Sequence, residues 1–491
     1  MYRKEDTQQL KFENFYLPFG GKLRSDNRWV ILAGQIPWQV IEQTYGQQFC
    51  DDNGAAAKPA RMALGALIIK ERLGVTDRET VDQISENPYL QYFLGLSEYT
   101  DKEPFHHSMM THFRKRFDQA ALSAINQSIV DQVMMPKQEK DETLSEDDDT
   151  PSNQGKLIVD ATCTPADVAY PTDLNLLNEA REKTEEMIDL MHAPCVGVES
   201  KPRTYRQDAR KAYLAVAKQK KPGAKKIHKA LGQQLRYLRR NLSTIEQMAS
   251  LGRLKYLGKR LYRLLLVVQE LYRQQLWMYE NHTHSISHRI ISLSQPHVRP
   301  IVRGKAKSPV EFGAKVSVSL VNGFSFVEKI GWEAYNESCD LIEQIERYRQ
   351  RFGFYPESAH VDQIYKTREN RVYCQSKGIR LSGPMLGRPT EDAERLKTQR
   401  AICRQDEIDR IPIEGKFGQG KRRFTLARIM AKLAITSETV IMVSFMVMNL
   451  EKILSRILFL CLFVVHDMLA KGLRSNLERA RWIPNLLPAA A

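Results

Sequence analysis

Apolar residues recur at helical spacing through most of the first 135 residues. After Pro59, the residues Leu64, Leu67 and Ile68 stand at positions i, i+3 and i+4, which places them on one side of an α-helix. Residues 76–79, Thr-Asp-Arg-Glu, then have the form of a capping box and predict the start of the next helix. The N-terminal part of the chain is therefore predicted to be all-α.

A basic helix is predicted from Ser108 to Phe117. Met109 and Phe113 lie on its apolar face with Phe117, and the opposite face is rich in Lys and Arg. Short helices that end in a basic one resemble a helix-turn-helix reader of DNA. The alternative is a basic face that meets only solvent. The candidate DNA contacts on this helix are Arg114, Lys115 and Arg116.

Further along the chain the period of the apolar residues changes. Residues 316–320 alternate between apolar and polar, which predicts a strand, and a glycine turn separates it from a second strand. The short apolar runs Lys156–Asp160 and Ser358–Asp362 each predict a strand that ends on an acid. Helices are predicted at 341–352 and 412–434. Strands interleaved with helices indicate an α/β layer, with its first strand far from the others in sequence.

A long helical segment, predicted from Leu174 to Leu293, is inserted after that first strand. Its residues 218–240 are dense in Lys and Arg, and a basic helical face of this kind can track a phosphate backbone. Apolar residues recur every three or four positions further along, as in the seam of a helical hairpin or short coiled coil, and are predicted to pack against a neighbouring helix. They are Leu251, Leu254, Leu257, Leu261, Leu264, Val268 and Leu271.

The charge of the chain narrows the choice of partner. The net charge is +15, which points to a polyanion, either nucleic acid or an acidic membrane surface. The most hydrophobic stretch, Thr439–Val465, is interrupted by Glu451, Lys452 and Arg456, so a buried helix is expected there rather than a membrane span. No signal peptide is evident, and the seven scattered cysteines form no C-x-x-C pair. We expect reduced thiols in a cytoplasmic protein.

Composition also suggests the domain boundaries. A stretch rich in Asp, Glu, Ser and Pro has the low hydrophobicity of a flexible linker. The predicted parts are an N-terminal DNA-binding domain (1–135), this acidic linker (136–155), the first part of a catalytic domain (156–173), a basic helical insertion (174–295), the second part of the catalytic domain (296–470) and a C-terminal tail (471–491).

Three acids form the candidate catalytic site. Asp160 and Asp362 end the two apolar runs, and strand ends are where functional groups converge in α/β sheets. Arg410, Glu414 and Lys421 stand four and seven residues apart, which brings them close to one face of a helix. Pro412 predicts that this helix starts near it, with Arg410 just outside. The alternative is a glycine-rich loop with surface charges at chance spacing.

Phosphodiester cleavage explains why three acids are needed together. The reaction requires a positioned nucleophile and a stabilised leaving oxygen, which two Mg²⁺ ions about 4 Å apart can provide. Mg²⁺ prefers carboxylate oxygens and water as ligands. Arg and Lys beside the acids can hold DNA phosphates.

The chain resembles a bacterial insertion-sequence transposase of the DDE class, in the branch of insertion sequences 4 and 5. The resemblance runs from about Pro59 to about Leu450. The motifs that carry it are Leu157–Thr162, Arg303–Lys305, Glu311–Lys315, Val361–Tyr365, Thr367–Arg371, Gly378–Arg380, Leu386–Pro389 and the Y-(2)-R-(3)-E-(6)-K pattern at Arg410, Glu414 and Lys421. The tyrosine of that pattern falls on Glu407, which puts the handling of a hairpin at the transposon end in doubt.

The resemblance implies a fold, a cofactor and partners. It implies an RNase H-like mixed sheet whose Asp160, Asp362 and Glu414 hold two Mg²⁺ ions, with Mn²⁺ able to replace them. It implies that Arg410 and Lys421 contact double-stranded DNA, both transposon ends and target. A homodimer or higher assembly on DNA, associated with the nucleoid and with no membrane, is expected.

Other functions stay open at this point. A structure-specific nuclease on the same fold would use the same acids without joining strands. A repressor derived from a transposase would bind DNA without catalysis. A zinc site at His282, His284 and His288 is a weaker candidate, because no Cys or acid lies close to it in sequence.

Overall fold

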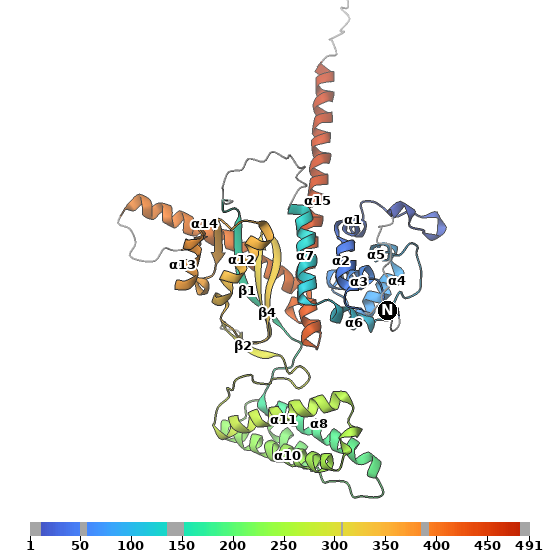
Figure 1. Ribbon diagram of the computed structural model, residues 1–491, viewed down its shortest axis with the longest axis vertical. Coiled ribbons are helices and arrows are strands. Elements are labelled where there is room, and N and C mark those ends of the chain that lie inside the picture. The colour runs from blue at the N-terminus through green and yellow to red at the C-terminus, as the bar shows by residue number, and fades with distance from the viewer. Residues whose placement is uncertain (1–10, 50–55, 135–151, 306–307, 384–391, 482–491) are drawn as a thin grey trace, which may run out of the picture.

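The computed structural model describes residues 11–49, 56–134, 152–305, 308–383 and 392–481 (Figure 1). The predicted acidic linker lies almost entirely outside these ranges, as does the end of the predicted C-terminal tail. In space the described chain has three parts. A mixed sheet with its covering helices lies next to a group of N-terminal helices, and a separate helical bundle lies below both in Figure 1.

A six-stranded mixed sheet forms the middle of the molecule. The hydrogen-bonded order is β2-β3-β1-β5-β6, and β4 also pairs with β3. Because β1 is antiparallel to β3 and parallel to β5, the two kinds of pairing meet at β1. The predicted mixed α/β layer is therefore confirmed. The strands are β1 (Lys156–Pro165), β2 (Arg299–Lys305), β3 (Ser308–Val321), β4 (Phe324–Gly331), β5 (Ser358–Val361) and β6 (Arg380–Leu381).

Strand β1 continues past Asp160, where the sequence predicted its end. Its pairing with β3 extends from Asp160 opposite Val318 to Pro165 opposite Gly313. The residues after Asp160 are buried although two of them are threonines, and the hydroxyl of Thr164 donates to the carbonyl of Ala314 (3.3 Å). The acid therefore interrupts the apolar run without ending the strand.

The helix that carries Arg410 and Glu414, α14, is longer than predicted. It runs from Ala393 to Arg423, so the prediction of a helix over 412–434 is wrong at both ends and Arg410 lies inside the helix. The side chain of Asp392 caps its start by accepting hydrogen bonds from two backbone N–H groups. Pro412 is accommodated at an exposed position within the helix. The first half of α14 is charged and lacks apolar periodicity, which explains why its start was missed.

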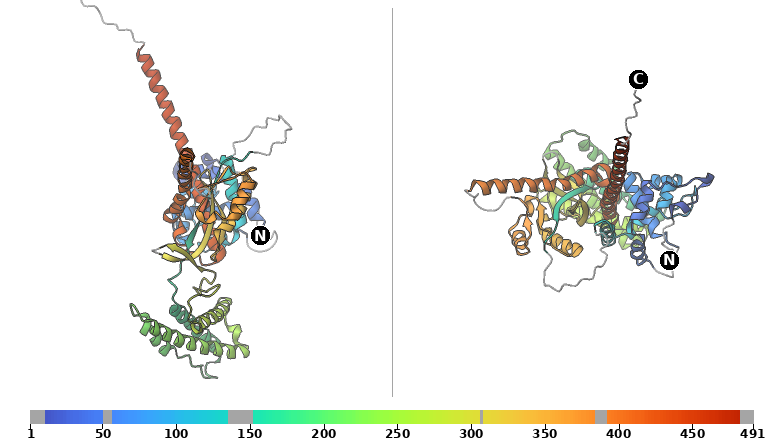
Figure 2. Two further views of the ribbon diagram at one scale, coloured as in Figure 1. Left: turned by 90° about the vertical axis from the view of Figure 1, so that its left-hand side faces the viewer. Right: turned by 90° about the horizontal axis from the view of Figure 1, so that it is seen from above.

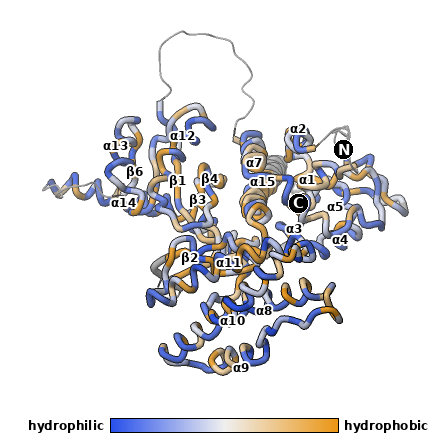
Figure 3. Tube along the Cα trace, turned by 60° about the horizontal axis from the view of Figure 1, so that its bottom comes forward, coloured by the Kyte–Doolittle hydropathy of each residue, from blue (hydrophilic) through white to orange (hydrophobic). Residues whose placement is uncertain are grey.

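Other helices cover the sheet and connect it to the N-terminal part. These are α7 (Gln119–Met134), α12 (Leu341–Phe352), α13 (Arg368–Ser376) and α15 (Ala434–Arg481). Figure 3 shows largely hydrophobic residues on α7 and α15, which lie side by side. Asn449 of α15 donates to Asn126 of α7 (2.9 Å) and to the carbonyl of Ser325 in β4 (2.8 Å). Among the described helices, α15 included, none has the length and hydropathy of a membrane span.

The N-terminal helices share one hydrophobic core with the sheet. One buried cluster joins N-terminal residues such as Phe15 to the sheet and to α15 as far as Leu454. The predicted capping box is confirmed here, because the Thr76 side chain accepts from the backbone N–H of Glu79 (3.2 Å) at the start of α4, and Gly74 (φ 69°) ends α3 just before it. The helices are α1 (Arg28–Gln35), α2 (Trp38–Gly46), α3 (Ala60–Leu73), α4 (Asp77–Glu86), α5 (Pro88–Phe93) and α6 (Met109–Arg116).

The helical bundle, by contrast, has hydrophobic cores of its own. Its helices are α8 (Asp173–His192), α9 (Arg206–Ala217), α10 (Ala224–Ser250) and α11 (Lys259–Glu280). Figure 2 shows the bundle apart from the sheet and joined to it by extended segments of chain. The predicted packing of the leucines is confirmed from Leu254 to Leu271, which belong to these cores, whereas Leu251, next to the turn at Gly252 (φ 73°) between α10 and α11, is 66% exposed.

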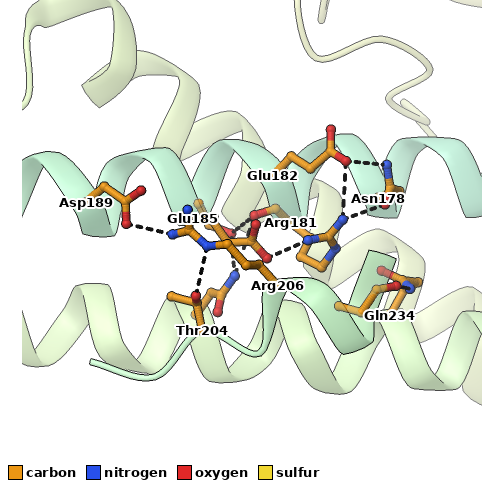
Figure 4. A network of polar contacts seen from close by, with 11 residues as sticks. Asn178, Arg181, Glu182, Glu185, Asp189, Thr204, Arg206 and Gln234 are labelled. Carbon is orange, nitrogen blue, oxygen red and sulfur yellow. Dashed lines mark hydrogen bonds and ion pairs between the residues drawn. The ribbon is translucent and has the colours of Figure 1, made fainter. Parts of the chain in front are cut away.

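A buried polar network holds this bundle together (Figure 4). Arg181 of α8 is 1% exposed and donates to Glu185 (2.5 Å) and to the side chain of Asn178 (2.7 Å). Asn241 of α10 donates to the hydroxyl of Thr184 (3.0 Å) and so links the two helices. Buried charges are tolerated only when they are paired in this way, so the network restricts how α8 and α10 can pack.

Candidate active site

Asp160 and Asp362 occupy neighbouring positions on adjacent parallel strands. Val159 of β1 pairs with Val361 of β5, so each acid is the next residue beyond that pair. Asp362 directly follows β5, and its carboxylate accepts from the backbone N–H of Gln363 (2.7 Å). Asp160 accepts from its neighbour's N–H in the same way (2.8 Å). Parallel register places the two side chains on the same face of the sheet.

Helix α14 brings Glu414 toward this pair through Arg410. The guanidinium of Arg410 lies 3.0 Å from the carboxylate of Glu414, one turn further along the helix, and 3.9 Å from that of Asp160. The predicted proximity of Arg410 and Glu414 on one helix face is therefore confirmed by the geometry. Glu414 is 56% exposed and Asp160 only 18%, so the acids extend from the interior to solvent.

The surroundings of Asp160 disfavour its charged form. Burial raises the pKa of its carboxyl group to about 6, and the nearby carboxylates of Glu337 and Asp362 act in the same direction. The Ala161 N–H and Arg410 oppose this rise. Asp160 and Glu414 therefore share the one guanidinium of Arg410.

Glu337 is a site residue that sequence reasoning missed. It begins the short 3₁₀ helix η5 (Glu337–Asp340) and pairs with Lys315 (3.0 Å). The hydroxyl of buried Tyr365, three residues after Asp362, donates to it (3.4 Å). No apolar run or motif precedes Glu337, so only the packing of η5 against the segment after β5 reveals it.

The predicted DNA contacts fall into different environments. Lys421 lies on the last turn of α14, two turns beyond Glu414. On α6, Arg114 is turned inward, is 6% exposed and pairs with Asp77 through both guanidinium nitrogens. Arg116 stays exposed and lies over the ring of Phe49 (4.3 Å), and Lys115 is exposed. Two of the three cations of this helix thus face solvent.

One other group of residues has the composition of a metal site. The ligand atoms of His360, Asp406 and Asp409 lie within 4.8 Å of one another. Both carboxylates are, however, already paired: Asp406 accepts two bonds from Arg380 (2.8 and 2.9 Å), and Asp409 pairs with Lys156 (2.5 Å). These pairs connect α14 to β6 and β1, and the His360 ring of β5 lies 3.6 Å from the Asp406 carboxylate. The arrangement favours anchoring of α14 over metal binding.

The three histidines considered for zinc do not converge. The His288 ring lies 2.6 Å from Glu333, and the His284 ring lies 3.6 Å from Asp173. His282 stacks on His228 at 4.9 Å between ring centroids. Within the described ranges they form no metal-binding group.

Two segments of the chain are similar to known protein families. Residues 359–451 match the family described as "Transposase DDE domain", and residues 18–116 match "Transposase domain (DUF772)". Both descriptions are of transposase domains, and each match covers less than half of the chain. The first segment contains Asp362, Arg410, Glu414 and Lys421, whereas Asp160 lies outside both.

One similar protein comes from Rhizobium meliloti. It is described as "Uncharacterized protein ORF8 in nfe locus" and is 28% identical over 183 residues, which is 37% of this chain and 80% of that protein. No solved structure matches the chain.

Proposed function

We propose that this chain is a DNA transposase that binds the ends of an insertion sequence, cleaves DNA phosphodiesters and joins the resulting 3′-hydroxyl ends to target DNA. Its mixed sheet, with a helical bundle inserted after the first strand, would be an RNase H-like catalytic core. The observation that carries the proposal is that Asp160 of β1 and Glu414 of α14 both lie beside Arg410, while Asp362 follows the neighbouring strand β5 in register with Asp160.

The donor set has the chemistry that two divalent ions require, although the three acids are not among the described groups whose ligand atoms all lie within 4.8 Å of one another. All three acids offer carboxylate oxygens, the ligand type that Mg²⁺ prefers, and Mn²⁺ accepts the same ligands. When bound, two such ions would stabilise the attacking and leaving oxygens of an in-line displacement. Burial raises the pKa of Asp160 to about 6, and a bound cation would favour the charged form that burial disfavours.

The chain's own residues have separate tasks in this proposal. Asp160 and Asp362 are held by the register of β1 and β5, so the sheet fixes their spacing. Glu414 reaches the site from α14, which Asp406 and Asp409 anchor to the sheet. Arg410 neutralises the acids in the free protein and can turn to a DNA phosphate, with Lys421 holding DNA further along the same helix.

DNA would be gripped mainly by the helical bundle. Residues 201–263 contain 19 Lys and Arg against two Asp and Glu. Lys115 and Arg116 add exposed cations on α6. Because an insertion sequence has two ends that must be handled together, we expect a dimer or a larger assembly on DNA.

A strand-transfer assay tests this function against a nuclease on the same fold. The substrate is DNA from both flanks of the gene, with a second plasmid as target. We expect Mg²⁺-dependent cleavage followed by joining of the 3′ ends to the target. Cleavage without joining would support the nuclease, and binding without cleavage would support a repressor. Unchanged transposition by Asp160→Asn in cells would contradict the proposed mechanism.

A further inference from the structure

The helical bundle contains a cavity of about 410 Å³ between α8, α10 and α11. This volume falls within the range of small-molecule sites, roughly 300 to 1,000 Å³. Leu177 of α8, Leu231 of α10 and Met278 of α11 give the cavity much apolar surface. The other lining residues include three flat rings, a buried amide and the first residues of α10. These polar and aromatic features determine what the cavity can hold.

The three rings stack along the wall of the cavity. The ring of His228 in α10 lies parallel to that of Tyr279 in α11, with 4.2 Å between centroids and 9° between planes. The ring of His282, just after α11, also stacks on His228, at 4.9 Å. Gly232 lets Tyr279 lie close to α10, because a Cβ there would be 2.5 Å from the tyrosine hydroxyl. A planar aromatic ligand can extend such a row by stacking.

Gln275 of α11 provides an unsatisfied acceptor in the wall of the same cavity. It is 3% exposed, and its amide NH₂ group donates to the carboxylate of Asp173 (2.8 Å). That carboxylate also accepts from Arg289 (2.6 Å), so it acts as an acceptor and fixes which way the amide is turned. In the described chain nothing donates to the Gln275 amide oxygen. A ligand with an N–H group would remove this unfavourable state.

The start of α10 lies at the cavity as well. Ala224 and Lys225, its first two residues, both line the cavity, and Gly223 before them has no side chain with which to cap the helix. Among the described residues, none accepts from the backbone N–H groups of Ala224 and Lys225 or pairs with the exposed Lys225 ammonium. Free N–H groups at a helix start, together with an ammonium group, favour a phosphate.

We propose that this cavity binds a single nucleotide unit, with its base beside the three rings and its phosphate at the start of α10. The base would donate an N–H group to the Gln275 amide oxygen. An apolar ligand would leave that oxygen unsatisfied, and a phosphate alone would leave the rings unused. Two sources supply this chemistry: a free nucleoside monophosphate, or an unpaired nucleotide of DNA held by the basic bundle. Only the second source rests on the proposed function.

The test is a calorimetric titration of the full chain with AMP. A chelator is present throughout, so that no divalent ion can hold the nucleotide at the acids of the sheet. Ribose 5-phosphate, which lacks the base, and adenosine, which lacks the phosphate, are titrated in parallel. The test variants are Gln275→Met and Lys225→Met. The matched controls are Gln269→Met on α11 and Lys229→Met on α10, which replace exposed residues outside the cavity.

We expect saturable binding of AMP by the wild type and at least about tenfold weaker binding of ribose 5-phosphate, because the base supplies the stacking. Gln275→Met should weaken AMP binding roughly three- to tenfold, since it removes one hydrogen bond to the base. Lys225→Met should weaken the binding of AMP but not of adenosine. Both controls should bind AMP within about twofold of the wild type.

Three results would overturn the proposal: no saturable AMP binding by the wild type, equal affinity of the wild type for AMP and ribose 5-phosphate, or equal weakening in the Gln275 variant and its control. The first two need no variant, so they decide the matter even if Gln275→Met does not fold.

Competition by DNA identifies the source of the nucleotide. A duplex with one extrahelical base and a fully paired duplex of the same length are each used to displace AMP from the wild type. Stronger displacement by the first duplex supports DNA as the source, and equal displacement by both supports a free nucleotide. Absence of DNA cleavage by the wild type would instead count against the proposed function and leave the result with AMP intact.

Discussion

The helical bundle and the mixed sheet use charge in opposite ways. In the bundle, cations outnumber acids strongly between residues 201 and 263, and the charge is on the outside of a separate core. In the sheet region, charged side chains converge in matched sets, such as Asp160 and Glu414 around Arg410 or Arg380 with Asp406. Matched, partly buried charges fix atomic positions, whereas unmatched exposed cations attract a polyanion without fixing one geometry. We infer that chemistry resides in the sheet and most of the DNA grip in the bundle.

Replacing one catalytic acid should have the largest effect, because it should slow DNA cleavage without weakening DNA binding. Asp160→Asn is expected to slow DNA cleavage by roughly 10²- to 10⁴-fold, because each metal ion supplies several kcal/mol of transition-state stabilisation. DNA affinity, measured by anisotropy, should stay within about twofold because the bundle is untouched. A parallel loss of affinity would show that the two tasks are not divided in this way.

The same variant makes a prediction about stability. The pKa of Asp160 in the folded protein, about 6, lies above the ordinary 3.8. The folded state therefore loses stability as the pH rises from 3.8 to about 6, and this loss is still complete at pH 7. The metal-free Asp160→Asn protein should therefore be more stable at neutral pH, by up to about 3 kcal/mol. Chemical denaturation in the presence of a chelator measures this. A less stable variant would contradict the origin assigned to the raised pKa.

The buried network offers a way to disrupt the bundle alone. Arg181→Met leaves the buried carboxylate of Glu185 without its main cation, at a cost of about 3 kcal/mol. Since the bundle has its own cores, hydrogen exchange should rise across α8 and α10 while the sheet stays protected. The double replacement Arg181→Met with Glu185→Leu should recover part of the loss. Uniform destabilisation of the whole chain would mean that bundle and sheet unfold together.

Neutralising exposed cations of α10 should lower the affinity for DNA without affecting folding. Lys226, Lys229 and Arg236 are exposed, and replacing all three with Gln should flatten the salt slope by about 2 to 3. At moderate salt we expect the affinity to fall on the order of tenfold to a hundredfold. The cleavage rate of the saturated complex should be unchanged. A lower cleavage rate of the saturated complex with unchanged DNA affinity would contradict the assignment of DNA binding to the bundle and of cleavage to the sheet.

The smallest effect concerns pH and Lys416. Its folded pKa, about 8, lies below the ordinary 10.5, so the unfolded chain binds more protons between these values and stability rises with pH there. Lys416→Met lacks this contribution, so it should exceed the wild type in stability at neutral pH. The difference should shrink by roughly 1 kcal/mol by pH 9 and shrink further as the pH approaches 10.5. A difference that stays constant with pH would show that Lys416 titrates normally.

Local signals predicted the regular parts of the fold well. The helix over 341–352 has an apolar stripe and ends at Gly353, whose positive φ (84°) stops it, so its bounds agree with the prediction. The strand before Asp362 and the capping box at Thr76 were likewise visible in short windows. In each case the determining residues are neighbours in sequence.

Long-range pairing explains what the sequence did not reveal. Arg114 was expected on an exposed face, but Asp77 from α4 draws it inward. The part of α14 before Pro412 lacks apolar periodicity and is joined to β6 and β1 through Asp406 and Asp409. Glu337 is brought to the site by packing against Tyr365. By contrast, Glu414 was found because its relation to Arg410 is a local helical spacing.

The central claim, a metal-dependent site made of Asp160, Asp362 and Glu414, is tested most directly by single-turnover cleavage of DNA carrying the flanks of the gene. The wild type is compared with Asp160→Asn, Asp362→Asn and Glu414→Gln, with and without Mg²⁺. The account predicts Mg²⁺-dependent release of 3′-hydroxyl ends by the wild type and a loss of at least about 10²-fold in all three variants. Cleavage without a divalent ion, or a wild-type rate in any one of the three, would contradict it.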